Sequence, residues 1–384
     1  MKALYSGMAE CLYRPSVNIL NAARIRLFGW TVIMTIISTI TGCNSFGPDA
    51  LRGTHPLYND AIVSSMNDQF IQNIVRLHYR DPTFFLDVAS VTASMKLDMG
   101  GGLDQSSVGL NGGADIMQYS LGGAYSTTPT ISYSPLQGES FVKSVLSPIP
   151  IDVVFALSTS GWNAQRVFGL CVERMNGIEN APNASGPTPQ KAPESGRDLK
   201  RLMQLVEEVS IDHLIAPRTD PKTKETQLEI KSSTKFAKQI WEIKDLLGLD
   251  QQRQFYHVNS DFIAPSPDTI SIRTRSLMSI FFYLSHHVDT PQAHQDAGLV
   301  TITHNPDGSV FDWGTTAAGS MFHIRQSNEQ PEMAFVAIPY RGNWFYLADN
   351  DLDSKSTFML LMQLFRLQAG ATKAVGPTLT IPVH

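Results

Sequence analysis

The sequence predicts an α+β fold in which helices pack on antiparallel β-sheets, in two units joined by a Pro-rich linker. Apolar residues recur every three or four positions over residues 59–79, as in an amphipathic helix. Two later segments alternate between apolar and polar residues, which is the period of a β-strand. Residues 180–197 then contain four prolines, which is typical of a linker, and a second set of helix and strand patterns follows.

The composition is globular, with a mildly acidic charge. The chain has 384 residues, of which 42% are hydrophobic and 17% charged, and its formal net charge is −5. Residues 1–42 hold four of the 30 basic and one of the 35 acidic residues, so the remainder has 26 basic against 34 acidic residues. Nucleic-acid binding relies on clustered Lys and Arg. We therefore expect no nucleic-acid partner.

An apolar segment near the N-terminus is typical of a secretory signal. Leu27–Ile40 is apolar and follows Arg24 and Arg26. The segment is shorter than the roughly 20 apolar residues of a membrane-spanning helix. It fits the basic region and the apolar core of about 7–15 residues that make up a signal peptide.

The next residues carry a lipidation motif. Ile40-Thr41-Gly42-Cys43 resembles the lipobox of bacterial lipoproteins, with an aliphatic residue three positions before the Cys and Gly directly before it. The resemblance implies cleavage of a 1–42 signal peptide between Gly42 and Cys43, and acyl chains on Cys43 that anchor the protein in a bilayer. Asn44 in place of Asp implies the outer membrane, with the body on its periplasmic face. Because the region before the apolar core is long, a later start at Met8 or an uncleaved transmembrane anchor is the alternative.

We expect residues 43–56 to be a tether and residues 57–179 to be an N-terminal α+β unit with a long β-hairpin. Its first helix covers Asn59 to Tyr79. Asp81-Pro82 ends this helix, because the residue before a proline is disfavoured in the α region.

The most informative pattern is the alternation over Ala89–Met99 and Met117–Tyr133, with Gly-rich residues between the two runs. Both runs are long for ordinary strands of about 5–6 residues. One interpretation is an antiparallel hairpin that covers the first helix and turns its polar face to water. The other is a membrane-crossing hairpin, because a transmembrane strand needs about 9–11 alternating residues. Such a hairpin would have to close a barrel with copies from other subunits, since lipid does not tolerate unpaired strand edges.

Helices before the linker and an α+β unit at residues 198–384 complete the prediction. Expected helices cover 138–146, 151–158, 162–175, 198–213, 233–247, 275–287 and 351–368. Expected strands cover 254–258, 269–272, 299–303, 309–313, 321–326, 333–339 and 344–347. Asn305–Gly308 and Tyr340–Asn343 carry the turn residues of two hairpins.

Three segments of the C-terminal unit support a likeness to known chains. They are the helix start Arg275-Ser276-Leu277, the hairpin segment Tyr340–Tyr346 and the helix start Asp351–Ser356. Their order is similar to that in a set of uncharacterised Gram-negative lipoproteins. The resemblance implies the cell envelope as the location and brings no assigned activity.

The candidates for metal and nucleophilic chemistry are weak. His286, His287, His294, Asp296 and His304 lie close together in the chain, but adjacent helical residues point about 100° apart, so His286 and His287 do not easily share a metal. Ser158–Gly161 lacks the Gly-x-Ser-x-Gly pattern of a nucleophile elbow. Cys171 stands in an apolar context that favours a buried thiol over a nucleophile.

The remaining motifs also favour structural interpretations. The Gly-rich residues 100–102 and 112–113 lie between strands and not before a helix, so they do not predict a phosphate loop. Residues 349–353 lack the Gly and Glu of a calcium loop and are explained by helix capping. Arg273, Arg275, Arg341 and Lys355 could form an anion pocket, although surface ion pairs explain them as well.

We therefore expect no catalytic residue, no metal and no cofactor, and we interpret the chain as a lipid-anchored protein with a structural or assembly role. Its partners would be envelope proteins or further copies of itself. One alternative is an oligomeric outer-membrane pore or export component that uses the 89–133 hairpin. Another is an unrecognised periplasmic hydrolase, since a catalytic triad can assemble from distant residues.

Overall fold

The structure is a computed structural model that describes residues 46–104, 118–187, 192–193, 196–210, 212–260, 266–369 and 379–382. The chain divides into two compact units, residues 1–63 and residues 64–384. Of the first unit, the structure describes residues 46–63, which are helical. The expected signal peptide, Gly42 and Cys43 lie outside the described residues.

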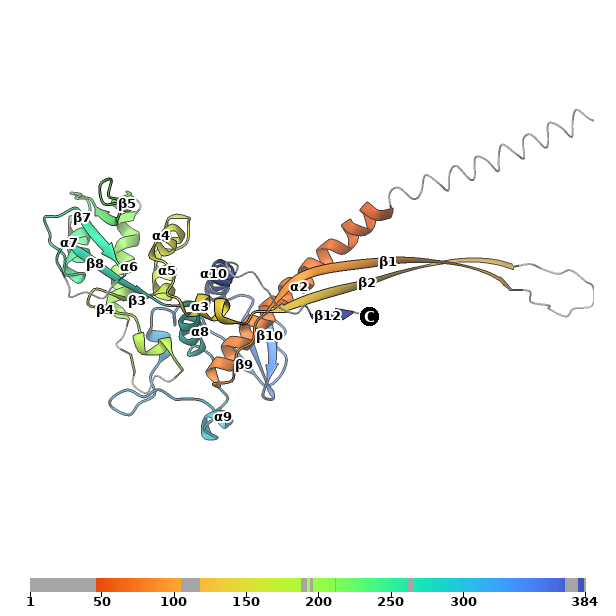
Figure 1. Ribbon diagram of the computed structural model, residues 1–384. Helices are drawn as coiled ribbons and strands as arrows, with labels where there is room; N and C mark the ends of the chain where they lie inside the picture. Colours follow the sequence, from red (N-terminus) through yellow and green to blue (C-terminus); the bar gives the residue numbers. More distant parts are fainter. Residues whose placement is uncertain are drawn as a thin grey trace, which may run out of the picture. The chain divides into compact units, whose positions relative to one another are not determined.

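The described residues form an α+β fold, which confirms the predicted class (Figure 1). The helices are α2 (Phe46–His78), α3 (Glu139–Leu146), α4 (Ile151–Thr159), α5 (Ala164–Cys171), η2 (Pro182–Ser185), α6 (Arg197–Ser210), α7 (Ala237–Leu246), α8 (Leu277–Ser285), α9 (Gln292–Asp296), η3 (Trp313–Thr315) and α10 (Leu352–Ala369). The strands are β1 (Leu86–Asp104), β2 (Gln118–Pro135), β3 (Val172–Met175), β4 (Ile178–Glu179), β5 (Ile215–Thr219), β6 (Thr226–Ile230), β7 (Phe255–Asn259), β8 (Thr269–Thr274), β9 (Arg325–Ser327), β10 (Ala334–Tyr340), β11 (Asn343–Ala348) and β12 (Leu379–Pro382).

Helix α2 is longer than the sequence predicts. It begins at Phe46 and includes Pro56, so it takes in residues that we expected to form a tether. Its second half carries the predicted apolar stripe, in which Ile71 and Ile74 are completely buried. The helix ends at His78, shortly before Asp81-Pro82, as expected.

Strands β1 and β2 form the predicted hairpin, with 18 antiparallel pairs from Leu86 opposite Pro135 to Asp104 opposite Gln118. Figure 1 shows the two strands side by side over this length. Gly100–Gly102, expected to lie between the two strands, instead belong to the paired part of β1. Strand β12, which the sequence did not predict, adds to the other side of β2.

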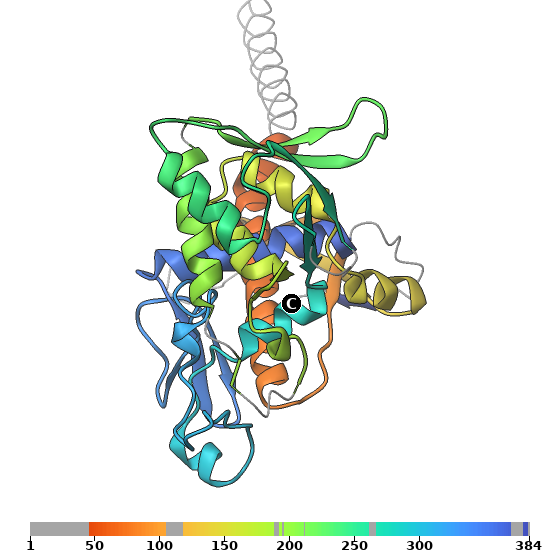
Figure 2. The same cartoon turned by 90° about the vertical axis from the view of Figure 1, so that its left-hand side faces the viewer.

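The second sheet has six strands in the order β4-β3-β8-β7-β6-β5, and only β7 and β8 are parallel. Helices α6 and α7 pack side by side (Figure 2). The helix predicted over 162–175 was wrong in its last turn. It ends at Cys171, because Val172–Met175 pairs with β8 as strand β3.

The predicted division at residues 180–197 was also wrong. Strands β3 and β4 precede this segment, yet they share a sheet with β8, which follows it. The segment itself is partly packed, because Ala181 and Ala184 are buried and Asn180 donates to the carbonyl oxygens of Gly169 and Val172. The Pro-rich segment is therefore a connection within one compact unit.

A third sheet has the order β10-β11-β9. The predicted hairpin at Tyr340–Asn343 is confirmed, and Arg341 and Gly342 both have positive φ, of 48° and 80°. Such a pair of dihedrals is that of the primed turn which two-residue hairpins prefer. The hairpin expected around Asn305–Gly308 is reduced to its turn and one bridge, between His304 and Val310.

One apolar core joins most of these elements. Its aromatic centre brings together Phe70 of α2, Phe281 of α8 and Phe365 of α10 with Phe85, the residue before β1. The ring centroids of Phe70 and Phe365 are 4.8 Å apart, in an edge-to-face geometry that favours aromatic pairs. The first residues of the hairpin are thus attached directly to the core.

Candidate functional site

The candidate site is the sheet formed by β1, β2 and β12, here called the hairpin sheet. Its register brings the two predicted alternations into phase, since Leu97 is opposite Tyr125 and Met99 is opposite Gly123. Directly opposite residues of an antiparallel pair share one face. The apolar positions of both sequence runs therefore fall on one face of the sheet and the polar positions on the other.

A β-bulge near the start of the hairpin preserves this phase. The register shifts between Val88 and Ser90, so that Val88 pairs with Tyr133 while Ser90 pairs with Ser132. Because Ala89 is an extra residue in β1, the even-numbered positions before it share a face with the odd-numbered positions after it. Val88 consequently joins the apolar series although its number is even. With Tyr133 and side chains of α2 it lines a pocket.

Two amide side chains of α2 hold the chain that enters β1. Asn73 donates to the carbonyl oxygen of Phe84 over 2.8 Å and accepts from the Phe84 N–H over 3.0 Å. Gln69 forms the same pair of bonds with the backbone of Leu86. Gln69 and Asn73 are four residues apart, so both side chains lie on the same face of the helix. Together they satisfy the backbone N–H and C=O groups of Phe84 and Leu86, as a neighbouring strand would.

The edges of the hairpin sheet are mostly open. Strand β12 pairs with residues 130–133 of β2, with Leu379 opposite Tyr133 and Ile381 opposite Ile131. Among the described residues, no strand pairs with the outer edge of β1 or with the other edge of β2 between Gln118 and Pro129. An open edge is a row of N–H and C=O groups that can pair with another chain.

A second cluster of polar side chains lies at the end of α8, in a cleft of about 480 Å³. The imidazole of His286 stacks on the indole of Trp313, with centroids 4.4 Å apart, and His287 meets the same indole edge-on at 6.0 Å. Elsewhere in the lining of the same cleft, His323 Nε2 lies 2.7 Å from Asp289 Oδ1. One tryptophan therefore contacts both histidines, which the sequence order alone did not indicate.

Burial keeps the imidazoles of His286 and His287 neutral. It lowers the pKa of His286 and of His287 to about 3, and the neighbouring His78 and His286, respectively, lower it further. The Nε2 atoms of both are buried and have no hydrogen-bond partner in the described part of the chain. The hydrogen bond with Asp289 instead raises the pKa of His323. No group of three His, Cys, Asp or Glu side chains that could hold a metal occurs among the described residues.

The side chains considered and rejected as nucleophiles on the basis of the sequence have structural roles. Ser158 donates to the carbonyl oxygen of Val154 and Ser160 to that of Ala156, each within its own helical turn. Cys171 is completely buried, as expected, and burial raises the pKa of its thiol to about 12. A neutral, buried thiol is a poor nucleophile.

The four cationic residues do not converge on one pocket. Arg273 pairs with Glu173, Arg341 with Asp81 and Lys355 with Asp349, while Arg275 is completely buried. Helix capping is confirmed at residues 349–353, because Asp351 accepts from the backbone N–H of Ser354 at the start of α10.

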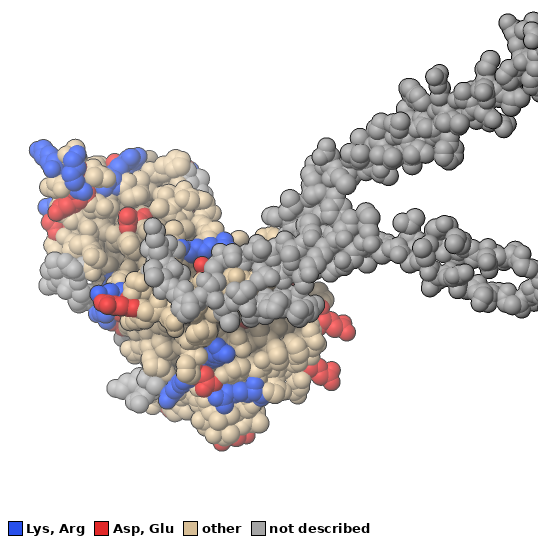
Figure 3. Space-filling view, turned by 45° about the vertical axis from the view of Figure 1, so that its right-hand side comes forward, with Lys and Arg blue, Asp and Glu red and all other residues tan. Residues whose placement is uncertain are grey.

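Charge is mixed on the described part of the face that Figure 3 shows. On the face in Figure 3, described basic and acidic side chains are interspersed and do not gather into a patch of one sign. No helix among the described residues has both the length and the hydropathy of a membrane span.

Comparison with protein-family models, with curated protein sequences and with solved structures finds no match for this chain. The expected relationship to Gram-negative lipoproteins therefore stays a prediction.

Proposed function

We propose that this chain is a lipid-anchored envelope protein that assembles with further copies of itself through the open edges of the hairpin sheet. The observation that carries the proposal is the length of the ladder, 18 pairs, of which β12 covers only four positions on one side. A two-stranded hairpin is marginally stable in water by itself. A ladder of this length gains stability when its edges are paired.

A second copy offers edges of the right direction. If the hairpins of neighbouring copies point the same way, the free edge of β2 in one copy meets the free edge of β1 in the next as an antiparallel pair. This contact is head-to-tail, because each copy uses two different edges. Head-to-tail contacts generate rings when the rotation closes and filaments when it does not.

The oligomer can be tested with a shortened hairpin. Ser94 lies opposite Thr128, so joining them through Asn-Gly removes residues 95–127 while a two-residue hairpin turn keeps the register. We expect the full chain, extracted in mild detergent, to run as an oligomer by light scattering, and the shortened chain to run as a monomer. A monomeric full chain, or a shortened chain that still forms oligomers, contradicts the proposal.

The lipid anchor has its own test. The Ile40–Cys43 motif supports acylation of Cys43, and several acyl chains hold a protein on a bilayer essentially permanently. We expect metabolic labelling with palmitate to mark the native chain and to leave Cys43→Ala unlabelled. Label on both chains, or on neither, would remove the anchor from the proposal.

A second candidate function is an oligomeric outer-membrane pore or export component. The in-phase apolar positions favour it, because the run from Ala89 to Met99 has the length of a transmembrane strand. We expect such an oligomer to release a small dye from lipid vesicles, and the shortened hairpin to release none. A hairpin that stays fully open to protease on intact vesicles would leave only the assembly role.

A further inference from the structure

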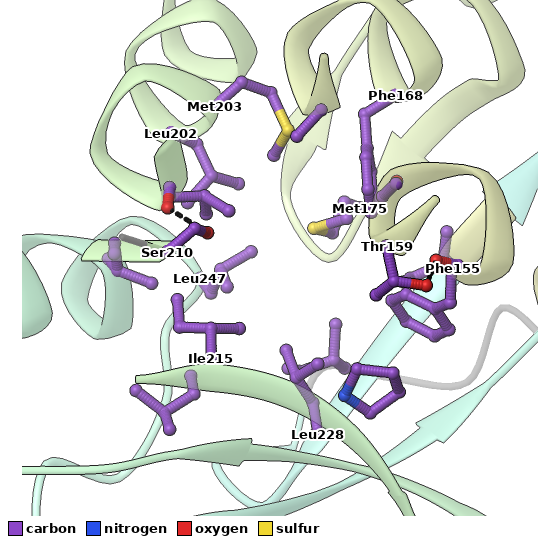
Figure 4. A pocket seen from close by; sticks show the side chains of 18 residues that line it. Phe155, Thr159, Phe168, Met175, Leu202, Met203, Ser210, Ile215, Leu228 and Leu247 are labelled. Carbon is purple, nitrogen blue, oxygen red and sulfur yellow. Dashed lines mark hydrogen bonds between the residues drawn. The ribbon is translucent and has the colours of Figure 1, made fainter. Parts of the chain in front are cut away.

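An apolar cavity of about 110 Å³ lies between helices and the six-stranded sheet. Helices α4, α5 and α6 supply Phe155, Phe168 and Leu202, and the sheet supplies Ile230 and Ile272. Figure 4 shows the labelled side chains arranged around an open centre. Protein interiors are normally packed without such space. The cavity therefore calls for an explanation.

The cavity has a closed floor and a more open rim. Ile230 and Ile270 on the floor are completely buried, whereas Ile215 and Leu228 are half-buried. Ser210, at the end of α6, is exposed. Apolar side chains at the rim thus retain contact with water. A ligand that enters at this rim would remove that apolar surface from water, which is favourable.

The polar side chains of the lining offer no free hydrogen-bond donor to a ligand. The hydroxyls of Ser158, Thr159 and Ser210 donate to backbone carbonyl oxygens one turn earlier in their own helices. None of the described lining residues is charged. A ligand with a charge or several hydrogen-bonding groups would lose its hydration here without compensation.

The size of the cavity limits the ligand further. An apolar cavity of about 150 Å³ in another protein stays dry and takes up benzene, so this slightly smaller space suits one ring or a few methylene groups. Met175 and Met203 in the lining are flexible side chains that adapt to the shape of a ligand. We propose that this cavity binds one neutral hydrocarbon group, a single aromatic ring or the end of one alkyl chain.

The test measures the melting temperature of the full chain with benzene, 1-hexanol or phenol. Since a ligand that binds only the folded state stabilises it, benzene or 1-hexanol at several times its dissociation constant should raise the Tm by about 2–4 °C. At equal free concentrations of the two ligands, the larger of the two shifts identifies a ring or an alkyl chain as the better fit. At the same concentration, phenol should give a smaller shift than benzene, because a hydroxyl on the ring that enters the cavity loses its hydration, whereas the hydroxyl of 1-hexanol is at the far end of the chain and stays in water at the rim.

Variants that fill the cavity provide the control. Val206→Phe and Ala164→Leu add side-chain volume at two lining positions, and we expect both to lose the ligand-dependent shift. Ala156→Leu adds the same volume as Ala164→Leu at an exposed position of α4 outside the lining, and it should keep the shift. An unchanged Tm in the native chain, a shift with phenol equal to that with benzene, or a shift that survives in the filled variants overturns the proposal.

Discussion

Arg275 is completely buried, and its guanidinium donates to backbone carbonyl oxygens of Leu170, Val172 and Asn180 while it packs over the ring of Tyr283. It therefore joins the end of α5, strand β3 and the segment after β4 to the start of α8. A planar group with five donors can serve several acceptors at once, which an ammonium group cannot do in the same geometry.

We expect Arg275→Met to lower the free energy of unfolding by about 3–5 kcal/mol, because several buried carbonyl oxygens lose their donors together. Arg273→Met is the matched control, since that side chain is exposed and pairs with Glu173 at the surface. The control should cost less than about 1 kcal/mol. Urea unfolding of both variants measures the difference, and equal losses would contradict this role of Arg275.

Three histidines predict loss of stability in acid; His287 is buried, and His78 and His286 are partly buried. Burial lowers the pKa of His78 to about 4 and of His286 and His287 to about 3, against the ordinary value of 6.5. Below pH 6.5 the unfolded chain therefore binds more protons than the folded chain. Stability should fall as the pH drops from about 6.5 towards 4, by on the order of 1 kcal/mol per pH unit for each histidine.

Nearby charges modify this slope. Asp289 faces His78 and favours its protonation, and Arg275 opposes that of His287. His323 acts in the other direction, because its raised pKa adds stability in acid. Urea unfolding at pH 7 and pH 5 should show a shallower pH dependence for His287→Gln than for the exposed control His304→Gln. An equal pH dependence of the free energy of unfolding in the two variants would show that His287 does not contribute to the loss of stability in acid.

At the scale of elements, the attachment of the hairpin to α2 depends on side-chain amides. Gln69→Ala removes both hydrogen bonds to the backbone of Leu86, so we expect amide hydrogen exchange at residues 84–88 to become about five- to tenfold faster. Gln72→Ala, on the same helix, should leave this exchange unchanged. Mass spectrometry of the exchanged peptides measures the rate in both variants. An unchanged exchange rate at residues 84–88 in Gln69→Ala would contradict the attachment.

The sequence predicted those elements whose pattern is local. The alternation over 89–133 predicted both strands and their phase, and Arg341-Gly342 predicted its turn, because strand period and turn dihedrals depend on neighbouring residues. Strand β12 was missed, since four residues, Leu379–Pro382, are too few to show a period. The contact of Trp313 with His286 and His287 was also missed, because it depends on how a distant 3₁₀ turn packs on α8.

At the scale of the whole molecule, the error in the predicted division has one cause. Four prolines over 180–197 are a genuine sign of a non-repetitive segment, but they do not reveal whether the sheet continues across it. The pairing of Arg174 in β3 with Arg273 in β8 joins residues almost 100 positions apart, and no local pattern reports such a pair. Arg275, which bonds to the carbonyl oxygens of Val172 and Asn180, reinforces the same connection.

Residues 64–384 should therefore unfold as one cooperative unit. A protease site inserted within 188–191 allows the folded chain to be cut at the Pro-rich segment. We expect the two pieces to stay associated in a native gel, because the six-stranded sheet and the core contain elements from both sides of the cut. We also expect the isolated piece 198–384 to lack a cooperative thermal transition, since it is missing β3 and β4 and, from the aromatic centre, helix α2 and Phe85. Pieces that separate without denaturant, or a fragment that melts cooperatively by itself, would restore the division into two units.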